Sequence, residues 1–474
     1  MIAVNVDVND DGTFSETLPD VLRVEWRLGM AHPFDSIAAI GEARITVRSL
    51  SPPPPIGIRL RIGAYFTGMI HHTESYPLTG ESVIIARDAL AELAQNRVTI
   101  PPQINARADD IINEVIAQSR IRYPALTGWM VIGYGVLGTH QLLDDVVLVH
   151  TLDEGKSVFA YVGDTWGDGI PADEAAHIAA QSERGRFFIN RAGEAIFFNR
   201  HHTLTNVTPA ATFVDDMTDL DFTYGADVVN RIRIRITPRS VGDPNTILWT
   251  LSNPQRIAAG GVRRIVGRYR DSAGNAIGGI DFALPQFSGN AMRNGSGDDL
   301  TQQLEVVMDA GFSAAAFRIR NTGNRDIYLQ SLTVRGTPLI ADDPLMLEQS
   351  DLSSITFHGL RELTLNLPAL TDSDDAEQIA RYELGRRSSP RGTFRQMTLR
   401  YPDATALDLT LFDRITITET GTNHTADYLI CAEEHTVDRG GARHQIRWML
   451  EPADADCFII IGYSLPDGSR VLAY

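Results

Sequence analysis

The sequence predicts a mainly β, multi-domain protein with two tube-like β-barrels, an α+β segment and an inserted β-sandwich. Three observations lead to this fold class. The chain has 474 residues, enough for about three domains of roughly 150 residues each. Short strands with alternating apolar and polar residues fill both ends of the chain, and a further series of short strands separates them. The helical patterns are confined to a few segments between these β regions.

Residues 1–87 form the first predicted domain, a small β-barrel. Its strands alternate apolar and polar residues and are separated by turn residues. The proline run at 51–55 must be a loop, because proline cannot donate a hydrogen bond to a neighbouring strand. The quoted strands span 21–29, 43–49, 57–63 and 82–88.

Residues 88–240 are predicted to be an α+β segment with helices and a hairpin. Asp88 is placed to cap a helix over 89–96. A second helix over 106–119 carries its apolar residues on one face. Pro171 suits the first position of a third helix, over 171–183. The segment ends in the strand VVNRIRIRITPRS (228–240), one face of which is lined with arginine.

The stretch ERGRFFINRAGEAIFFNRHHTLTN (183–206) predicts a hairpin with a turn between Asn190 and Gly193. It ends in Arg200, His201 and His202, which raises the question of a metal or catalytic site. Adjacent residues of a strand point to opposite faces, so the two histidines cannot both reach one ion without a bend. Zinc ligands are normally two to five residues apart. The triplet therefore favours the polar end of a structural hairpin.

Residues 241–340 are predicted to form an inserted β-sandwich, and residues 341–474 a second β-barrel with one helix. Strands recur in the insert at roughly 8–14-residue spacing, the pattern of an all-β sandwich. The last segment holds one helix, capped by Thr371 to Asp375 and ending near 387, with Asp374 and Glu377 spaced as in a capping box. Its strands span 393–401, 413–419, 426–437, 443–452 and 457–463.

The charge and cysteine content exclude several classes of protein. The formal net charge is −18. This charge argues against tight binding of nucleic acid but permits DNA to pass along a repelling surface. Only two cysteines occur, Cys431 and Cys457, so the chain has no disulfide framework. The N-terminus shows no signal-peptide pattern, and no apolar run approaches the ~20 residues of a membrane span.

Catalytic motifs are missing from the sequence. It contains no Gly-x-Ser-x-Gly, Walker, HExxH, CxxC or Rossmann pattern. Paired acids occur at 144–145, 342–343 and 372–375, but each pair suits a turn or a helix cap. We therefore expect no enzyme, no catalytic residue, no cofactor and no metal ligand. The alternative is a carbohydrate-binding or glycoside-processing β protein, which would need carboxylates that converge in a cleft.

Several phrases, in a shared order, resemble phage minor tail proteins and the tail (baseplate) hub family. The chain is also similar to the central hub of contractile-tail baseplates. The phrases that carry the resemblance are VEWRLGMAHPFDSIAAIGEARITVRS, YFTGMIHHTESYP, ERGRFFINRAGEAIFFNRH, FRIRNTGNRDIYLQSLTVRGTPL, ELGRRSSPRGTFRQMTLRYPD and DRITITETG.

The resemblance implies a structural part of the virion, placed at the tail tip and assembled in the cytoplasm of the bacterial host. It implies a homo-oligomer, as a trimer whose two barrels per subunit form a pseudo-sixfold ring at the end of the tail tube. The implied partners are tail tube or distal tail proteins, the tape-measure protein, and tail fibre or tip proteins. DNA would be present only in transit, and no membrane span is implied.

Overall fold

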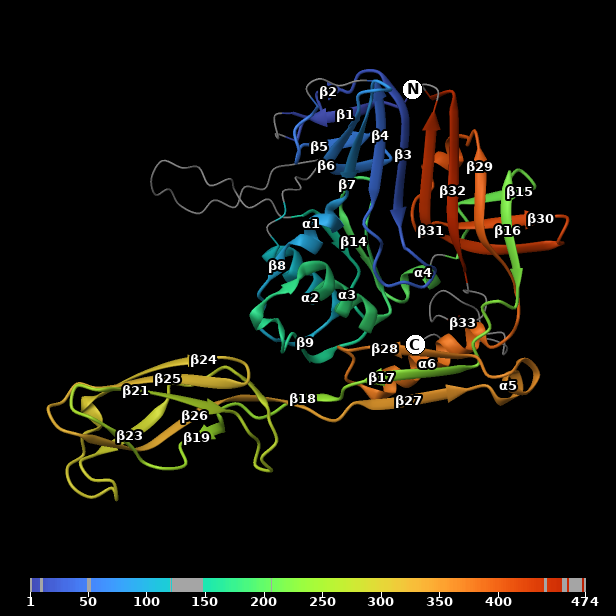
Figure 1. Cartoon of the computed structure of the whole chain (residues 1–474). Coiled ribbons are helices and arrows are strands. Elements are labelled where there is room, and N and C mark those ends of the chain that lie inside the picture. The colour runs from blue at the N-terminus through green and yellow to red at the C-terminus, as the bar shows by residue number, and fades with distance from the viewer. Residues whose placement is uncertain are drawn as a thin grey trace.

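A single thirteen-stranded sheet dominates the computed structural model, which describes residues 2–8, 12–48, 53–119, 121, 148–205, 207–438, 441–453, 458–459 and 471–472. Seven of its strands come from the start of the chain and six from the later part (Figure 1). The early strands are β1 (Val4–Asp7), β2 (Glu16–Thr17), β3 (Val21–Gly29), β4 (Glu42–Arg48), β5 (Arg59–Ile62), β6 (Phe66–Tyr76) and β7 (Glu81–Arg87). The later strands are β15 (Ala211–Val214), β16 (Asp219–Tyr224), β29 (Gly392–Arg400), β30 (Arg414–Glu419), β31 (His424–Asp438) and β32 (Arg443–Pro452).

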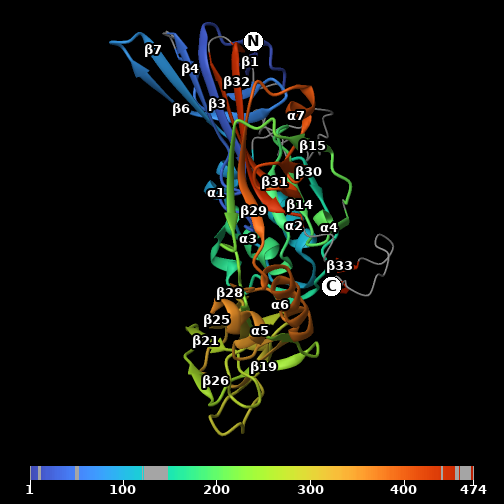
Figure 2. The same cartoon turned by 90° about the vertical axis from the view of Figure 1, so that its right-hand side faces the viewer.

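The two strand sets meet where β3 pairs with β31. The pairing is antiparallel and runs from Arg23 opposite Asp438 to Gly29 opposite Ala432. On its other side β3 pairs with β4, so neither edge of β3 is left without hydrogen-bond partners. Figure 2 shows β3, β29, β31 and β32 as one tall layer.

The mainly β class is confirmed. The structure adds a link between the two strand sets that was not predicted. The strands of 1–87 and those of the last segment belong to one continuous sheet. Among the described residues, the strand pairings close neither set into a barrel. The physical reason is that β3 is the edge strand of the early set, and residues 432–438 of β31 have a partner from the later set, β32, on one side only. Pairing the two satisfies backbone groups that would otherwise form exposed edges.

Helices and small sheets pack beside the early strands. Asp88 caps α1 (Ala89–Gln95) by accepting a hydrogen bond from the Leu90 amide, as predicted. Pro171 precedes α3 rather than opening it. The remaining elements of this layer are α2 (Ala108–Gln118), α3 (Ala172–Glu183), the 3-10 helix η1 (Trp166–Asp168), β8 (Arg97–Val98), β9 (Gln103–Ala106), β11 (Phe159–Val162) and β12 (Ile170–Pro171).

The predicted hairpin is present as β13 (Arg186–Ile189) and β14 (Ala195–Phe198). Its turn follows the expected chemistry, because the side-chain oxygen of Asn190 accepts from the amides of Ala192 and Glu194. Gly193 has φ +87°, which favours glycine. A third strand, β10 (His150–Leu152), runs parallel to β14, and the short helix α4 (His202–Thr205) follows the hairpin.

A three-stranded sheet lies below the main sheet in Figure 1. β17 (Arg231–Ile236) pairs with β27 (Leu345–Ser350) on one side and β28 (Glu362–Asn366) on the other. α6 (Ser373–Arg387) packs on this sheet and is capped by Asp372, whose carboxylate accepts from two amides. The predicted capping-box role of Glu377 is wrong, because its carboxylate instead contacts Arg381 and Gln349. The short helix α5 (Leu352–His358) joins β27 to β28, whereas α7 (Ala404–Asp408) lies between the main-sheet strands β29 and β30.

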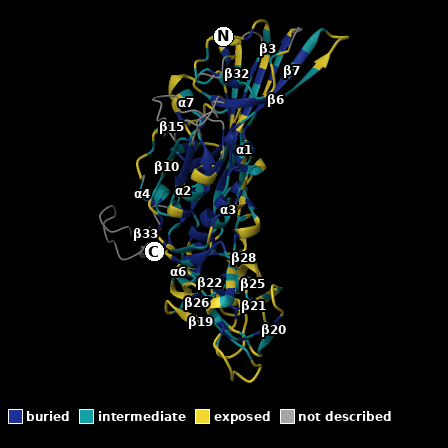
Figure 3. Ribbon diagram, turned by 90° about the vertical axis from the view of Figure 1, so that its left-hand side faces the viewer, coloured by how far each residue is buried: buried dark blue, intermediate teal, exposed yellow. Residues whose placement is uncertain are grey.

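The segment around 246–341 has a hydrophobic core of its own, separate from the main one. It consists of two sheets and projects from the body, with many exposed residues (Figure 3). Its elements are β18 (Arg239–Val241), β19 (Thr246–Thr250), β20 (Gln255–Ile257), β21 (Val262–Arg268), β22 (Gly278–Ile280), β23 (Gln286–Asn290), η2 (Thr301–Gln303), β24 (Leu304–Ala310), β25 (Ala314–Asn321) and β26 (Ile327–Ala341).

The bounds of the four predicted domains stay predictions. Of the predicted strand 457–463, only β33 (Phe458–Ile459) is described, and it pairs with β34 (Val471–Leu472). Among the described residues, no helix is long and apolar enough to cross a membrane.

Candidate functional site

The outer face of the main sheet carries a row of alternating charges. The row crosses five neighbouring strands, β7, β4, β3, β31 and β32, and each residue stands directly opposite the next. In that order it reads Arg87, Glu42, Arg27, Glu434 and Arg447. We call these five residues the charge row.

Two ion pairs within one chain neutralise four of the five residues of the charge row. A nitrogen of Arg87 lies 3.3 Å from a carboxylate oxygen of Glu42, and one of Arg447 lies 3.4 Å from Glu434. These side chains are between a third and a half exposed, and exposed pairs of this kind contribute about 0–1 kcal/mol each. The row therefore matters more for the character of the surface than for stability.

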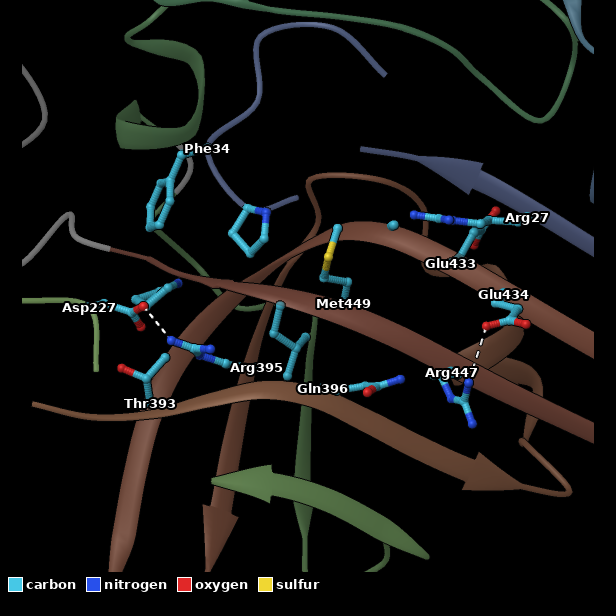
Figure 4. Close-up of a pocket in the computed structure, with 14 residues that line it drawn as sticks. Arg27, Phe34, Asp227, Thr393, Arg395, Gln396, Glu433, Glu434, Arg447 and Met449 are labelled. Atoms are coloured by element: carbon cyan, nitrogen blue, oxygen red, sulfur yellow. Dashed lines mark hydrogen bonds and ion pairs between the residues drawn. The ribbon is translucent and has the colours of Figure 1, made fainter. Parts of the chain in front are cut away.

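A hollow of about 410 Å³ lies at the end of the charge row, over β29, β31 and β32 (Figure 4). Phe34 stands on one side of it and Met449 at its floor. Arg395 is paired with Asp227 at 2.6 Å, and Arg447 with Glu434. The charged groups at its rim already have partners, so the hollow offers apolar and polar contact area rather than a set of free acids or bases.

Phe34 is held in place by groups from the later part of the chain. Its ring lies under two guanidinium groups, 3.9 Å from that of Arg387 and 4.7 Å from that of Arg386. Its backbone amide donates to the carboxylate of Glu451 at 3.0 Å. The positive φ of 72° is costly for a phenylalanine, and these contacts stabilise it.

Two arginines of the hairpin reach buried carboxylates on the main sheet. Arg186 donates to both oxygens of Glu451 at 2.9 Å. Arg191, in the hairpin turn, donates to both oxygens of Glu433 and to the carbonyl of Leu407. The Glu433 side chain is fully buried and that of Arg191 is 11% exposed. The hairpin is thereby bonded to β31 and β32.

Glu433 also belongs to a buried stack of rings. His435 stacks on Trp26 with ring centroids 4.4 Å apart. Its Nε2 lies 3.4 Å from Glu433, and its Nδ1 lies 3.0 Å from Nε2 of His444. Burial lowers the pKa of His435 and that of His444, the latter to about 4. Both rings are therefore neutral at pH 7, with His435 donating to Glu433 and accepting from His444.

The carboxyl of Glu433 stays ionised in this buried place. Burial alone would raise its pKa, but hydrogen bonds from Arg191 and His435 outweigh that effect and bring the pKa to about 2. A second buried carboxyl, Glu383, behaves alike. Burial opposes its ionisation, yet Arg184 at 2.8 Å and Arg387 at 3.4 Å hold its pKa well below the ordinary range. Both carboxylates act as fixed anions that join separate segments.

The Arg200, His201 and His202 triplet is divided among three different surroundings. Arg200 donates to the hydroxyl of Ser157, 2.8 Å away. Burial lowers the pKa of His201 to about 4. His202 contacts Asp153 at 2.7 Å and stacks on Phe198 at 3.5 Å. The predicted polar strand end is wrong in one detail, because His202 opens the helix α4.

The other candidate positions remain apart from one another. Asp372 is a helix cap, and the predicted pair at 342–343 lies exposed in the loop after β26. The pair at 144–145 lies outside the described residues. Within the described part of the chain, no group of three or more His, Cys, Asp or Glu residues could hold a metal ion.

The residues that join the hairpin to the sheet were missed in the sequence. One signal was available, because Glu433 and His435 share the strand parity of buried Val437 in the apolar strand ADYLICAEEHTV. A carboxyl at an inward position needs a cation. Nothing in the sequence indicates that the cation is Arg191, which lies 242 residues away.

Comparisons with known proteins give matches in structure alone. No protein-family model matches the sequence, and no curated protein matches it. A tail protein from Neisseria meningitidis MC58 aligns over 95% of this chain and 96% of its own, with 9% identity and a TM-score of 0.50. The 43 kDa tail protein of prophage MuSo2 from Shewanella oneidensis aligns over 96% and 99%, with 11% identity and a TM-score of 0.50.

The chain thus has the fold of these tail proteins over nearly its whole length. The fold that the family resemblance implied is confirmed. At such low identity the likeness carries no residue role from one protein to the other.

Proposed function

We propose that this protein is a structural component of a phage or phage-derived tail tip. It forms a ring, as a homotrimer, at the end of the tail tube, and DNA and the tape-measure protein pass through that ring. The observation that carries the proposal is the continuous sheet, in which early and late strands form one wall with a charge-alternating outer face. Its likeness in fold to two phage tail proteins supports the same role.

The wall suits a conduit for DNA. A protein holds DNA by neutralising phosphates with free arginines and lysines, which releases counterions. In the charge row each arginine has a glutamate opposite it, so the row offers no continuous cationic stripe. The net charge of −18 also disfavours binding of DNA phosphates. DNA can pass such a wall without being held.

The proposed partners are the tail tube or distal tail proteins on one side of the ring and tail fibre or tip proteins on the other. The proposed place of the protein is the virion, after assembly in the host cytoplasm. Its role there is mechanical, and we propose no catalytic, cofactor-binding or metal-binding residue.

The rival carbohydrate-binding role has less support. The tryptophans that a sugar platform would use are largely covered, since Trp26, Trp166 and Trp448 are each at most 2% exposed. These rings belong to the main hydrophobic core. Trp249 stacks on Phe317 inside the smaller core, and Trp129 lies outside the described residues.

The proposal is tested by the mass and shape of the native assembly. Purified protein is examined by native mass spectrometry and by electron microscopy over a range of concentrations, and whole particles are labelled with an antibody. We expect closed rings of three copies, with label at one end of the tail. A protein that remains monomeric at all concentrations, or label along the tail shaft or on the head, refutes the proposal.

A further inference from the structure

The projecting segment carries a cationic surface in an otherwise acidic protein. β21, β25 and β24 form a three-stranded sheet, and one face of it packs on the smaller core. The opposite face is exposed and carries four arginines against two acids. These six residues, the arginine face, are Arg264, Arg268, Arg318, Arg320, Glu305 and Asp309.

Among the described residues, Arg264, Arg268 and Arg318 of this face form no ion pair with an acid. Arg264 stands directly opposite Arg318, and the next residue in that row is Val307. Like charges opposite each other in a sheet are destabilising. One arginine of the face, Arg320, has an acid near it, Glu305 at 3.8 Å, and both side chains are more than half exposed.

Apolar side chains stand between these arginines. Val262, Val266 and Val307 are 49%, 64% and 61% exposed. A flat face that mixes arginine with apolar residues has the composition of a protein–protein interface. The occupant of such a face should be acidic, with some apolar surface of its own.

The charge distribution of the chain supplies such an occupant. Residues 241–340 contain ten arginines and eight acids, which gives +2, so the rest of the −18 chain carries −20. The segment and the body therefore attract each other. Figure 1 shows the segment and the strand β16 at opposite sides of the molecule, so the segment could meet β16 only on another copy.

The edge strand β16, with the loop that joins β15 to it, is the acidic counterpart. Among the strands that the structure describes, β16 pairs with β29 alone, and its other side has no strand beside it. Exposed Val214 and Tyr224 flank this edge. Its four exposed acids form no ion pair with any described residue. These acids, the acidic edge, are Asp215, Asp216, Asp219 and Asp221.

We propose that the arginine face of one copy binds the acidic edge of a second copy of this chain. The contact joins two different surfaces, so it repeats from copy to copy and closes into a ring when the rotation permits. This inference rests on the proposed ring and names the surfaces that hold it together. It also gives the projecting segment a role, which is to bind the neighbouring subunit.

The test is a charge reversal on each side, followed by their combination. The variants are Arg264→Glu with Arg318→Glu, Asp219→Arg with Asp221→Arg, and all four changes in one chain. A matched control reverses two other exposed arginines of the same segment, Arg256→Glu and Arg293→Glu. Assembly is followed by native mass spectrometry and analytical ultracentrifugation at two salt concentrations, and folding by circular dichroism.

We expect each one-sided variant to assemble at least about tenfold more weakly than the wild type, because like charges then meet at the contact. The four-change variant should regain assembly, and the control should assemble normally. Unchanged assembly of the Arg264→Glu/Arg318→Glu variant would overturn the inference while leaving the ring intact. Failure of the four-change variant to regain assembly while it remains folded would also overturn it.

Two further outcomes separate this inference from other readings. A wild-type protein that forms no ring at any concentration refutes the proposed function itself, and this contact with it. If a short DNA duplex binds the wild type and not the Arg264→Glu/Arg318→Glu variant, while assembly is unaffected, the arginine face is a nucleic-acid site instead.

Discussion

Replacing Glu433 by glutamine should destabilise the protein through one buried charge. The substitution keeps the size of the side chain but removes its negative charge. Arg191 then loses its anion while it remains 11% exposed, with its ring contact to Tyr65 and its hydrogen bond to Leu407 intact. An unpaired buried guanidinium is costly.

The magnitude follows from the pKa of Glu433. The ordinary value of 4.5 falls to about 2 in the folded protein, and each pH unit of difference corresponds to about 1.36 kcal/mol. The ionised carboxyl thus stabilises the fold by about 3 kcal/mol at neutral pH. Because the folded pKa is depressed, this stabilisation is complete above pH 4.5 and is lost as the pH falls toward 2. The deficit of the variant should shrink over the same range.

The measurement is urea unfolding followed by tryptophan fluorescence, since Trp26 stacks on His435 beside the pair. Glu434→Gln is the matched control, because Glu434 is the next residue on β31, is 49% exposed and pairs with exposed Arg447. The control should cost under about 1 kcal/mol. Arg191→Met combined with Glu433→Gln should recover part of the loss. Equal costs for Glu433→Gln and Glu434→Gln, or a deficit independent of pH, would refute the reasoning.

Three further predictions concern other parts of the chain. Asp372→Ala should cost about 1 kcal/mol in thermal unfolding, because α6 loses its cap, and an equal cost for the non-capping change Asp374→Ala would contradict this. Deletion of 242–338 with a short Asn-Gly turn should leave a folded body by circular dichroism, because Gly242 donates to the carbonyl of Pro338 and the two ends are adjacent; an insoluble product would show that the segment is needed for the body to fold. In a Cys457→Ser background, Cys431 should resist alkylation until the protein unfolds, because burial raises the pKa of its thiol, and rapid labelling of the native protein would show that it is accessible.

Local signals in the sequence were sufficient for most elements of secondary structure. Asp88 before an apolar helix predicted the cap of α1, and Asn190 with Gly193 predicted the hairpin turn. Such features depend on residues within a few positions, so the sequence contains all their causes. Boundaries were less certain, as Pro171 shows by preceding α3 instead of opening it.

The pairing of strands that are distant along the chain could not be predicted from sequence patterns. β3 pairs with β31, so Trp26 lies opposite His435, more than 400 residues later in the chain. Alternation shows which face of each strand is buried, but it does not select a neighbour. The charge row depends on that selection, since its five residues come from strands that meet only in the folded sheet.

The sequence alone determined the mainly β class, the helix caps, the hairpin turn and an acidic surface that disfavours holding DNA. The tertiary structure alone decided that early and late strands form one sheet, and that Arg186 and Arg191 fix the hairpin to Glu451 and Glu433. The physical reason is the separation along the chain of the residues that determine each feature. Caps, turns and alternation are set by neighbours along the chain, whereas a buried ion pair forms only where the packing of the whole core brings two distant charges out of water together.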